Sequence, residues 1–302
     1  MLESQTVLVT GAGGYIGRHV VQKLLDAGAS VIAADLHTDR VDSRAKHINA
    51  NVFSGDPAIY QQLGSPDICL HLAWKDGFVH NSPVHMTLLS SHFEFLYNMI
   101  AGGLKHVAVM GTMHEVGYHE GAITANTPTS PMSLYGVAKN ALRQAMEVWL
   151  KESKQDIIFQ WLRAYYIYGD DQNNHSVFTK ILEAHDQGKK TFPLTSGVNK
   201  CDYITVDMLA SQIAATVLQD KVTGTVNCCT GTARPLKDIV SEFIEQKQLD
   251  ITLQLGAFPD RPYDSPAIWG DNTKIKSVLE ACPYPALTEP NRGMMNKISS
   301  EG

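Results

Sequence analysis

The chain has 302 residues, of which 44% are hydrophobic and 19% are charged, and its net charge at pH 7 is −6. This composition is typical of a globular protein and excludes a disordered one. The negative charge argues against nucleic acid or an anionic membrane as the main partner. No apolar run approaches the roughly 20 residues of a membrane-spanning helix.

The five cysteines are odd in number and scattered along the chain. We therefore expect small core residues in a reducing compartment, not disulfides or a metal site. No signal peptide is expected before the first predicted strand. Together these features predict a cytoplasmic protein.

The first predicted elements are a buried strand at residues 7–9, a glycine-rich turn and a helix. Gly11 allows a tight reversal, Gly14 lets the backbone approach a pyrophosphate, and Gly17 lets the helix pack closely on the strand. The start of the helix offers N–H groups and a positive dipole end to phosphates. A purely structural turn is the alternative, but we predict a dinucleotide site with contacts from Gly11, Gly14, Tyr15, Ile16 and Gly17.

A second buried strand is predicted at residues 30–35, and it ends on Asp35. This carboxylate follows the glycine turn at close to the spacing of about 20 residues that suits hydrogen bonds to the adenine-side ribose. The alternative is an ordinary turn residue at a strand end. An acid here favours NAD over NADP, because a 2′-phosphate would meet like charge. His37 and Arg40 lie close enough in sequence to weaken that preference.

Two further strands are predicted, at residues 51–53 and 67–74. Asp56 follows the first of these strands, where it caps a helix or reaches the adenine. Because ligands of an open parallel sheet bind at the carboxyl ends of its strands, the end of the second strand is expected beside the pyrophosphate and nicotinamide ribose. The residues there are Ala73, Trp74 and Lys75.

A long apolar helix is predicted at residues 84–101, and such a helix is a common seam of a dimer. Three histidines in and before it, His80, His85 and His92, suggest a metal site. Their spacing does not give one helical face, and no carboxylate or cysteine lies near in sequence. We therefore predict no metal site and interpret them as histidines of a partly buried helix.

The next strand, at residues 106–110, leads to Thr112, and a further helix begins after Pro131. On that helix Tyr135 and Lys139 are one turn apart and share a face. A lysine ammonium near a phenol lowers the pKa of the tyrosine, and lysine also donates to ribose hydroxyls. The pair is thus suited to proton transfer beside a cofactor, although a surface pair that stabilises the helix is the simpler alternative.

Five motifs, together with Asp35 and Asp56, give the chain a resemblance to a known family. The motifs are TGAGGYIG at residues 10–17, HLAW at 71–74, GTMHEVG at 111–117, SLYGVAK at 133–139 and LRAYYIYG at 162–169. The chain resembles the extended short-chain dehydrogenase/reductase family in its nucleotide-sugar epimerase/dehydratase branch. That resemblance implies a catalytic triad of Thr112, Tyr135 and Lys139, in which Tyr135 exchanges a proton at a sugar oxygen. The hard step, hydride transfer, belongs to the nicotinamide cofactor.

Departures from the family pattern narrow the expected reaction. Met113 and His114 stand where the dehydratases carry Asp-Glu, so a 4,6-dehydratase is disfavoured. Tyr166 replaces an asparagine of many epimerases, and Cys201 replaces an arginine that contacts the nucleotide. Lys200 is our candidate to compensate for that arginine.

Further substrate contacts are also expected from the resemblance. Arg261 fits an arginine that meets the diphosphate, and Asp271 fits an acid that meets the base or ribose. Trp74, His114 and Glu115 are candidates to line the sugar pocket.

The predicted fold is α/β, with a doubly wound parallel sheet (a Rossmann fold) and a smaller C-terminal substrate-binding lobe. We expect residues 1–165 and 203–232 in the dinucleotide-binding domain, and 166–202 and 233–302 in the nucleotide-sugar lobe. The predicted function is NAD(P)H-dependent reduction of the C4 ketone of a 4-keto-6-deoxy nucleotide sugar. A 4-epimerase with tightly bound NAD and a non-catalytic NAD(P)-binding sensor are the alternatives, and a homodimer is expected.

Overall fold

A computed structural model describes residues 5–169, 176–260 and 264–288. Its main sheet has seven parallel strands in the order β3-β2-β1-β4-β5-β7-β11. In chain order the strands are β1 (Thr6–Thr10), β2 (Ser30–Asp35), β3 (Lys46–Asn49), β4 (Ile68–His71), β5 (His106–Thr112), β7 (Ile158–Ala164) and β11 (Gly224–Cys228). The order reverses between β1 and β4, which opens a crevice at the carboxyl ends of the strands.

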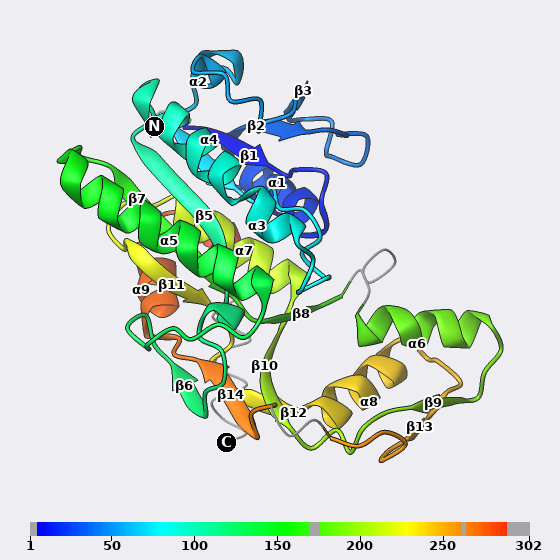
Figure 1. Cartoon of the computed structure of the whole chain (residues 1–302). Helices are drawn as coiled ribbons and strands as arrows, with labels where there is room; N and C mark the ends of the chain where they lie inside the picture. The colour runs from blue at the N-terminus through cyan, green and yellow to red at the C-terminus, as the bar shows by residue number, and fades with distance from the viewer. Residues whose placement is uncertain (1–4, 170–175, 261–263, 289–302) are drawn as a thin grey trace.

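Helices cover both faces of this sheet (Figure 1). One face carries α1 (Tyr15–Asp26), α7 (Val206–Val217) and α9 (Thr273–Ala281). The other carries α2 (Ile59–Gln62), α4 (Leu89–Ala101) and α5 (Leu134–Ser153), with the short α3 (Val84–Thr87) beside α5. Strand β1 shows why both faces need cover, because Val7 and Val9 enter one core and Leu8 the other.

A second, smaller sheet lies beyond the carboxyl end of the main sheet (Figure 1). Its strands run in the order β12 (Ala233–Pro235), β10 (Lys200–Thr205), β14 (Ala267–Gly270) and β6 (Gly121–Ile123), and β8 (Tyr166–Tyr168) pairs with β10. Helices α6 (Val177–Asp186) and α8 (Leu236–Gln246) share a core with the strand pair β9 (Thr191–Pro193) and β13 (Thr252–Gln254). The prediction of a doubly wound sheet with a smaller lobe is thereby confirmed.

Two segments lie differently from the predicted division of the chain. Helix α9, expected in the lobe, packs on α7 in a core of the main sheet. Strand β6, expected in the dinucleotide domain, pairs with β14 of the second sheet. The remaining division of the chain stays a prediction.

Two predicted elements are wrong in detail. The third strand is not 51–53 but β3, which pairs with β2 and is largely exposed at the sheet edge. The helix predicted at 84–101 is two helices, which meet at Leu88. Among the described residues, none of the helices combines the length and hydropathy needed to span a membrane.

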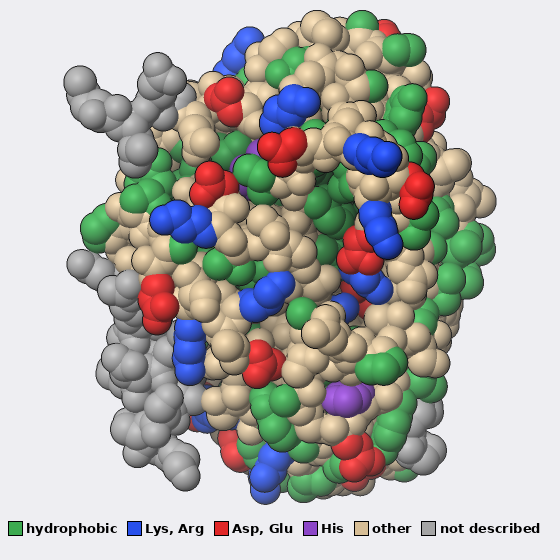
Figure 2. Space-filling model, turned by 90° about the vertical axis from the view of Figure 1, so that its left-hand side faces the viewer, with side chains coloured by type: hydrophobic (Ala, Val, Ile, Leu, Met, Phe, Trp, Pro, Cys, Tyr) green, Lys and Arg blue, Asp and Glu red, His purple; other side chains and the backbone are tan. Residues whose placement is uncertain are grey.

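The surface turned toward the viewer in Figure 2 carries Lys and Arg side chains interspersed with Asp and Glu. No broad basic patch is visible on that face, in keeping with the net charge of −6.

Candidate active site

The glycine turn between β1 and α1 is as tight as its sequence predicts. Gly11 has φ +69°, and a Cβ there would lie 2.6 Å from the Ala73 amide nitrogen. A Cβ at Gly17 would lie 2.1 Å from the Gly11 carbonyl oxygen. Gly14 is the N-cap of α1, and no side chain caps that end of the helix. Any larger residue at Gly11 or Gly17 would push the turn, α1 and β4 apart.

Asp35 lies against this turn at the end of β2. One carboxylate oxygen accepts a hydrogen bond from the Gly13 amide at 2.9 Å, and the other accepts from the Leu36 amide at 2.6 Å. Each oxygen has a further lone pair for a ribose hydroxyl. Asp35 therefore orders the turn in addition to the role predicted for it.

The other residues predicted at the cofactor lie around the same edge of the sheet. Tyr15 donates its hydroxyl to the Gly169 carbonyl at 2.5 Å and so ties the turn to the end of β8. Ile16 packs on the α1 side of the core, and Lys75 is exposed after β4. Asp56 accepts from the Ala58 amide and the Gln62 side chain, although α2 itself has Ala58 as its N-cap and no side-chain cap.

Thr112, Tyr135 and Lys139 come together at the carboxyl end of β5. Thr112 is the last residue of β5, and its hydroxyl faces the Tyr135 phenol closely enough to lower the pKa of that phenol. Ser133 caps α5, and the Tyr135 amide donates to the His80 carbonyl at 2.8 Å, which fixes the first turn. One turn later, the Lys139 ammonium donates to the Met110 carbonyl at 2.6 Å.

Burial controls the protonation of this triad. Burial and the Glu115 charge raise the pKa of the Tyr135 phenol, and the smaller effect of the nearby Thr112 hydroxyl opposes them. Burial also lowers the pKa of Lys139 to about 7. The expectation that Lys139 depresses the pKa of Tyr135 is therefore wrong for this structure, because the lysine nitrogen lies 5.9 Å from the tyrosine ring and bonds Met110 instead.

A buried glutamate, Glu115, supports the triad, whereas the sequence analysis expected it to line the sugar pocket, where it is not found. The Glu115 carboxylate is fully buried and accepts hydrogen bonds from the Thr112 amide at 2.7 Å and the Trp161 indole at 2.8 Å. Arg163 pairs with its second oxygen at 3.3 Å. The signal was present, since Thr-x-x-Glu at 112–115 is a capping box.

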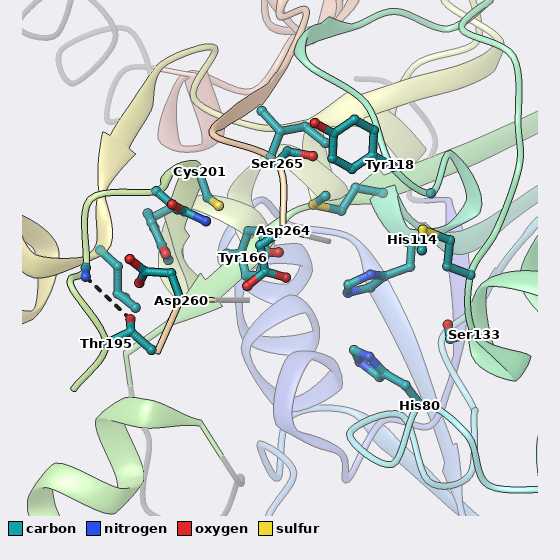
Figure 3. A pocket seen from close by; sticks show the side chains of 18 of the residues that line it. His80, His114, Tyr118, Ser133, Tyr166, Thr195, Cys201, Asp260, Asp264 and Ser265 are labelled. Atoms are coloured by element: carbon teal, nitrogen blue, oxygen red, sulfur yellow. Dashed lines mark hydrogen bonds between the residues drawn. The ribbon is translucent and has the colours of Figure 1, made fainter. Parts of the chain in front are cut away.

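A cavity of about 630 Å³ opens beside the triad, between the main sheet and the lobe. Figure 3 shows His80, His114 and Ser133 at one end and Thr195, Cys201 and Asp260 at the other. Its volume lies in the range typical of small-molecule sites.

Only some of the predicted substrate residues line this cavity. His114 and Tyr166 line it, whereas Trp74, Lys200 and Asp271 are not among its lining residues. Asp271 instead accepts from the amide and hydroxyl of Thr273 at the start of α9. Arg261 lies outside the described residues.

His80 is a residue that the sequence analysis did not assign to the site. Its ring stacks on Tyr135, with centroids 5.4 Å apart and planes at 12°, and lies 4.4 Å from the His114 ring. Burial lowers the pKa of both imidazoles, that of His114 to about 4. Both rings are thus neutral near pH 7 and present hydrogen-bonding groups without charge to the cavity.

Residues 7–229 match the NAD dependent epimerase/dehydratase family. The chain belongs to this family. The predicted resemblance is confirmed, and so, at the level of the family, is the prediction of an NAD cofactor.

One relative is the dTDP-6-deoxy-L-talose 4-dehydrogenase (NAD(+)) of Aggregatibacter actinomycetemcomitans, 42% identical over 273 residues, which are 87% of this chain and 98% of that one. Among solved structures, the UDP-glucose 4-epimerase of Thermotoga maritima with UDP-glucose has a TM-score of 0.77 at 21% identity, covering 97% of this chain and 99% of that one. The Thermus thermophilus UDP-glucose 4-epimerase with NAD also has 0.77, at 19% identity and 95% and 99% coverage. Both solved structures share the fold of this chain.

The residues of this family member fit an NAD molecule. The glycine turn has no room for side chains, and Gly14 leaves the start of α1 without a side-chain cap. Asp35 is the last residue of the neighbouring strand β2 and hydrogen-bonds the turn. These features make a phosphate-binding helix end next to a ribose-binding carboxylate. Within residues 5–169, 176–260 and 264–288, no group of three His, Cys, Asp or Glu side chains could hold a metal ion.

Proposed function

We propose that the protein reduces the C4 ketone of a 4-keto-6-deoxy nucleotide sugar, such as dTDP-4-dehydro-6-deoxyglucose, with a reduced nicotinamide cofactor. The observation that carries this proposal is that Thr112, Tyr135 and Lys139 come together at the carboxyl end of β5, next to residues that line a cavity of about 630 Å³. The 42% identical relative is named for the reverse chemistry, oxidation at C4 of a 6-deoxy sugar.

In this mechanism the chain's own residues hold the ketone and supply the proton. When bound, reduced nicotinamide supplies a hydride to C4, and the C=O electron pair moves onto the oxygen. Tyr135 donates its phenolic proton to that oxygen, and Thr112 holds the same oxygen by its hydroxyl. The raised pKa of Tyr135 supports this direction, because it keeps the phenol protonated at neutral pH. Lys139 retains N–H groups for the nicotinamide ribose.

The lining of the cavity suits the uncharged sugar of the proposed substrate. The diphosphate would then contact residues outside this lining. None of the described lining residues is Lys or Arg, and Asp260 and Asp264 contribute carboxylates. We propose Arg261, between those two acids in sequence, and the exposed Lys200 as the cations that meet the diphosphate. We retain Asp271 as a proposed contact of the nucleoside, and His114 and Tyr166 as contacts of the sugar.

A 4-epimerase that retains its NAD is the second candidate. Its support is the likeness to relatives with that activity in their names, for example a rice protein described as a probable UDP-arabinose 4-epimerase, 26% identical over 90% of this chain and 74% of its own. A non-catalytic sensor is disfavoured, since it has no need of the Thr112, Tyr135 and Lys139 arrangement. We further propose a homodimer in the cytoplasm, where the five buried free cysteines suit a reducing environment.

The test is to mix the purified protein with NADH or NADPH and a dTDP-4-keto-6-deoxyhexose, and to follow the loss of reduced nicotinamide. Stoichiometric consumption is the result that the proposal predicts. No consumption, with NAD already bound to the purified protein and C4 inversion of a fully hydroxylated nucleotide sugar, would replace the reductase by the epimerase.

Two variants test the assigned roles in the same assay. Tyr135→Phe removes the proton donor and should lower kcat by about 10²–10⁴-fold, with cofactor affinity nearly unchanged. Lys200→Ala should raise KM for the nucleotide sugar without changing kcat, and an unchanged KM would remove Lys200 from the site.

A further inference from the structure

Trp74, the residue that ends the HLAW motif, is packed into the triad and away from the sugar cavity. Its indole plane stacks on His92, with centroids 4.1 Å apart and planes at 18°. Its ring nitrogen donates to Nδ1 of His85 at 3.1 Å, and Nε2 of His85 faces the Val79 carbonyl at 3.0 Å. His92 therefore covers one face of the indole, and His85 fixes the edge that carries the ring nitrogen.

The ammonium of Lys139 is positioned over the ring of the same indole. Its nitrogen lies 3.7 Å from the Trp74 ring centroid, well inside the range of a cation–π contact. Lys139 is only 2% exposed, and it forms no ion pair with any residue that the structure describes. A buried ammonium without a carboxylate partner depends on the groups that replace its water. Here those groups are the Trp74 ring and the Met110 carbonyl.

We propose that Trp74 is a positioning residue, whose π face holds the Lys139 ammonium protonated and directed toward the nicotinamide ribose. The contact gives Lys139 an electrostatic partner without a hydrogen-bond acceptor, so its other N–H groups stay available for the cofactor. The role in catalysis rests on the proposed function, whereas the contact itself does not.

Other ionisable groups also act on Lys139. Glu115 on the turn after β5 favours its charged form. Burial lowers the pKa of both His71 on β4 and His92 on α4, with a smaller contribution from the lysine charge, so they stay neutral. Tyr135, which lies on α5 with Lys139, is protonated at neutral pH. A change at Trp74 removes its contact with the Lys139 ammonium and also alters its contacts with His85 and His92. Two substitutions that both lose the His85 hydrogen bond, one with and one without a π face, therefore isolate the cation–π contact.

The test compares Trp74→Phe with Trp74→Leu in the cofactor-free protein. Both substitutions remove the indole N–H and leave a smaller side chain, but only phenylalanine keeps a π face. Lysine labelled with ¹³C at Cε reports each lysine pKa by NMR, and Lys139→Met assigns the signal. Wild-type Lys139 should titrate at about 7, and the pKa in the Leu variant should fall below that in the Phe variant by about one unit.

Equal Lys139 pKa values in the Phe and Leu variants, or a higher value in the Leu variant, would overturn the proposal. Trp74→Met offers the same contrast with Phe if the Leu variant does not fold. The pH dependence of kcat/KM should shift with the NMR pKa in each variant. If the wild type shows no turnover, the proposed function fails while the NMR comparison still decides the role of Trp74.

Discussion

Burial determines how the residues at the carboxyl end of β5 exchange protons. It keeps the Tyr135 phenol protonated, which suits a proton donor, and it brings the pKa of Lys139 to about 7. The ammonium is then the main form below that pH and is lost above it. The sequence predicted that these residues meet, but their protonation depends on the surrounding core. Glu115, Trp74 and Met110 come from separate elements, and their contacts follow only from the fold.

The rate of ketone reduction should depend on the protonation of Lys139. We expect kcat/KM to be constant at low pH and to fall as pH rises through about 7, by about tenfold per unit. The measurement is a pH profile from about pH 6 to about pH 9 at constant ionic strength. In the Lys139→Arg variant the guanidinium stays charged over this whole pH range. The kcat/KM that this variant retains should therefore not decrease as pH rises. A wild-type profile that is flat over this range would contradict the assignment.

At the scale of elements, segments with a clear pattern of apolar residues were predictable from the sequence. The strand at the sheet edge and the break between α3 and α4 were not. The glycine turn and β2 lie where the sequence predicts them. Strand β3 was misplaced because its residues are polar and largely exposed, so it lacks the apolar pattern of a buried strand. The break at Leu88 is invisible in the sequence, since the apolar positions continue through it.

Asp202 joins elements that are distant in sequence. Its fully buried carboxylate accepts hydrogen bonds from the Thr230 amide and hydroxyl, the Gly231 amide and the Gly270 amide. It thereby ties β10 to β14 and to the segment after β11. The sequence analysis did not assign a role to this aspartate.

Asp202→Asn should lower the free energy of unfolding by about 2–4 kcal/mol, because the amide group replaces an acceptor and faces backbone donors. Urea unfolding followed by circular dichroism measures this change. Asp250→Asn, at an exposed pair with Lys190, is the control and should leave the free energy of unfolding nearly unchanged, because water screens an exposed ion pair. Equal effects of the two substitutions would refute the role given to Asp202.

The expected dimer is also a prediction at this scale. Rings of Phe93 and Tyr97 on α4 contact Trp149 on α5, and neighbouring Val148 is 64% exposed. We predict that the wild type elutes as a dimer and Val148→Glu as a single chain in size exclusion with light scattering. Val198→Glu, a valine 52% exposed in the lobe, should leave the dimer intact. A monomeric wild type would contradict the prediction.

At the scale of the whole molecule, the site lies where two layers of structure meet. The main sheet provides the glycine turn, Asp35 and the triad, and the second sheet and lobe close the cavity from the other side (Figures 1 and 3). The order of the layers could be predicted from alternating strands and helices. Most of the lining of the cavity could not, because its residues come from loops and from strands of the second sheet that are distant in sequence and meet only through tertiary packing.

A ligand that binds only the folded protein raises its stability, by about 2.7 kcal/mol at a hundredfold excess over Kd. NAD should therefore raise Tm by several degrees, and NADP at equal concentration by less, because its 2′-phosphate approaches the Asp35 carboxylate. Differential scanning fluorimetry measures both shifts. Asp35→Asn should narrow the difference between the cofactors. A larger shift with NADP in the wild type would contradict the preference.

The central claim is that this site transfers a hydride to C4 of a keto sugar. Its most direct measurement uses NADH deuterated at C4 of the nicotinamide, a dTDP-4-keto-6-deoxyhexose and NMR of the product. Our account predicts one deuterium at C4 of the sugar for each reduced nicotinamide consumed. A C4 epimer formed without deuterium and without loss of NADH would contradict it.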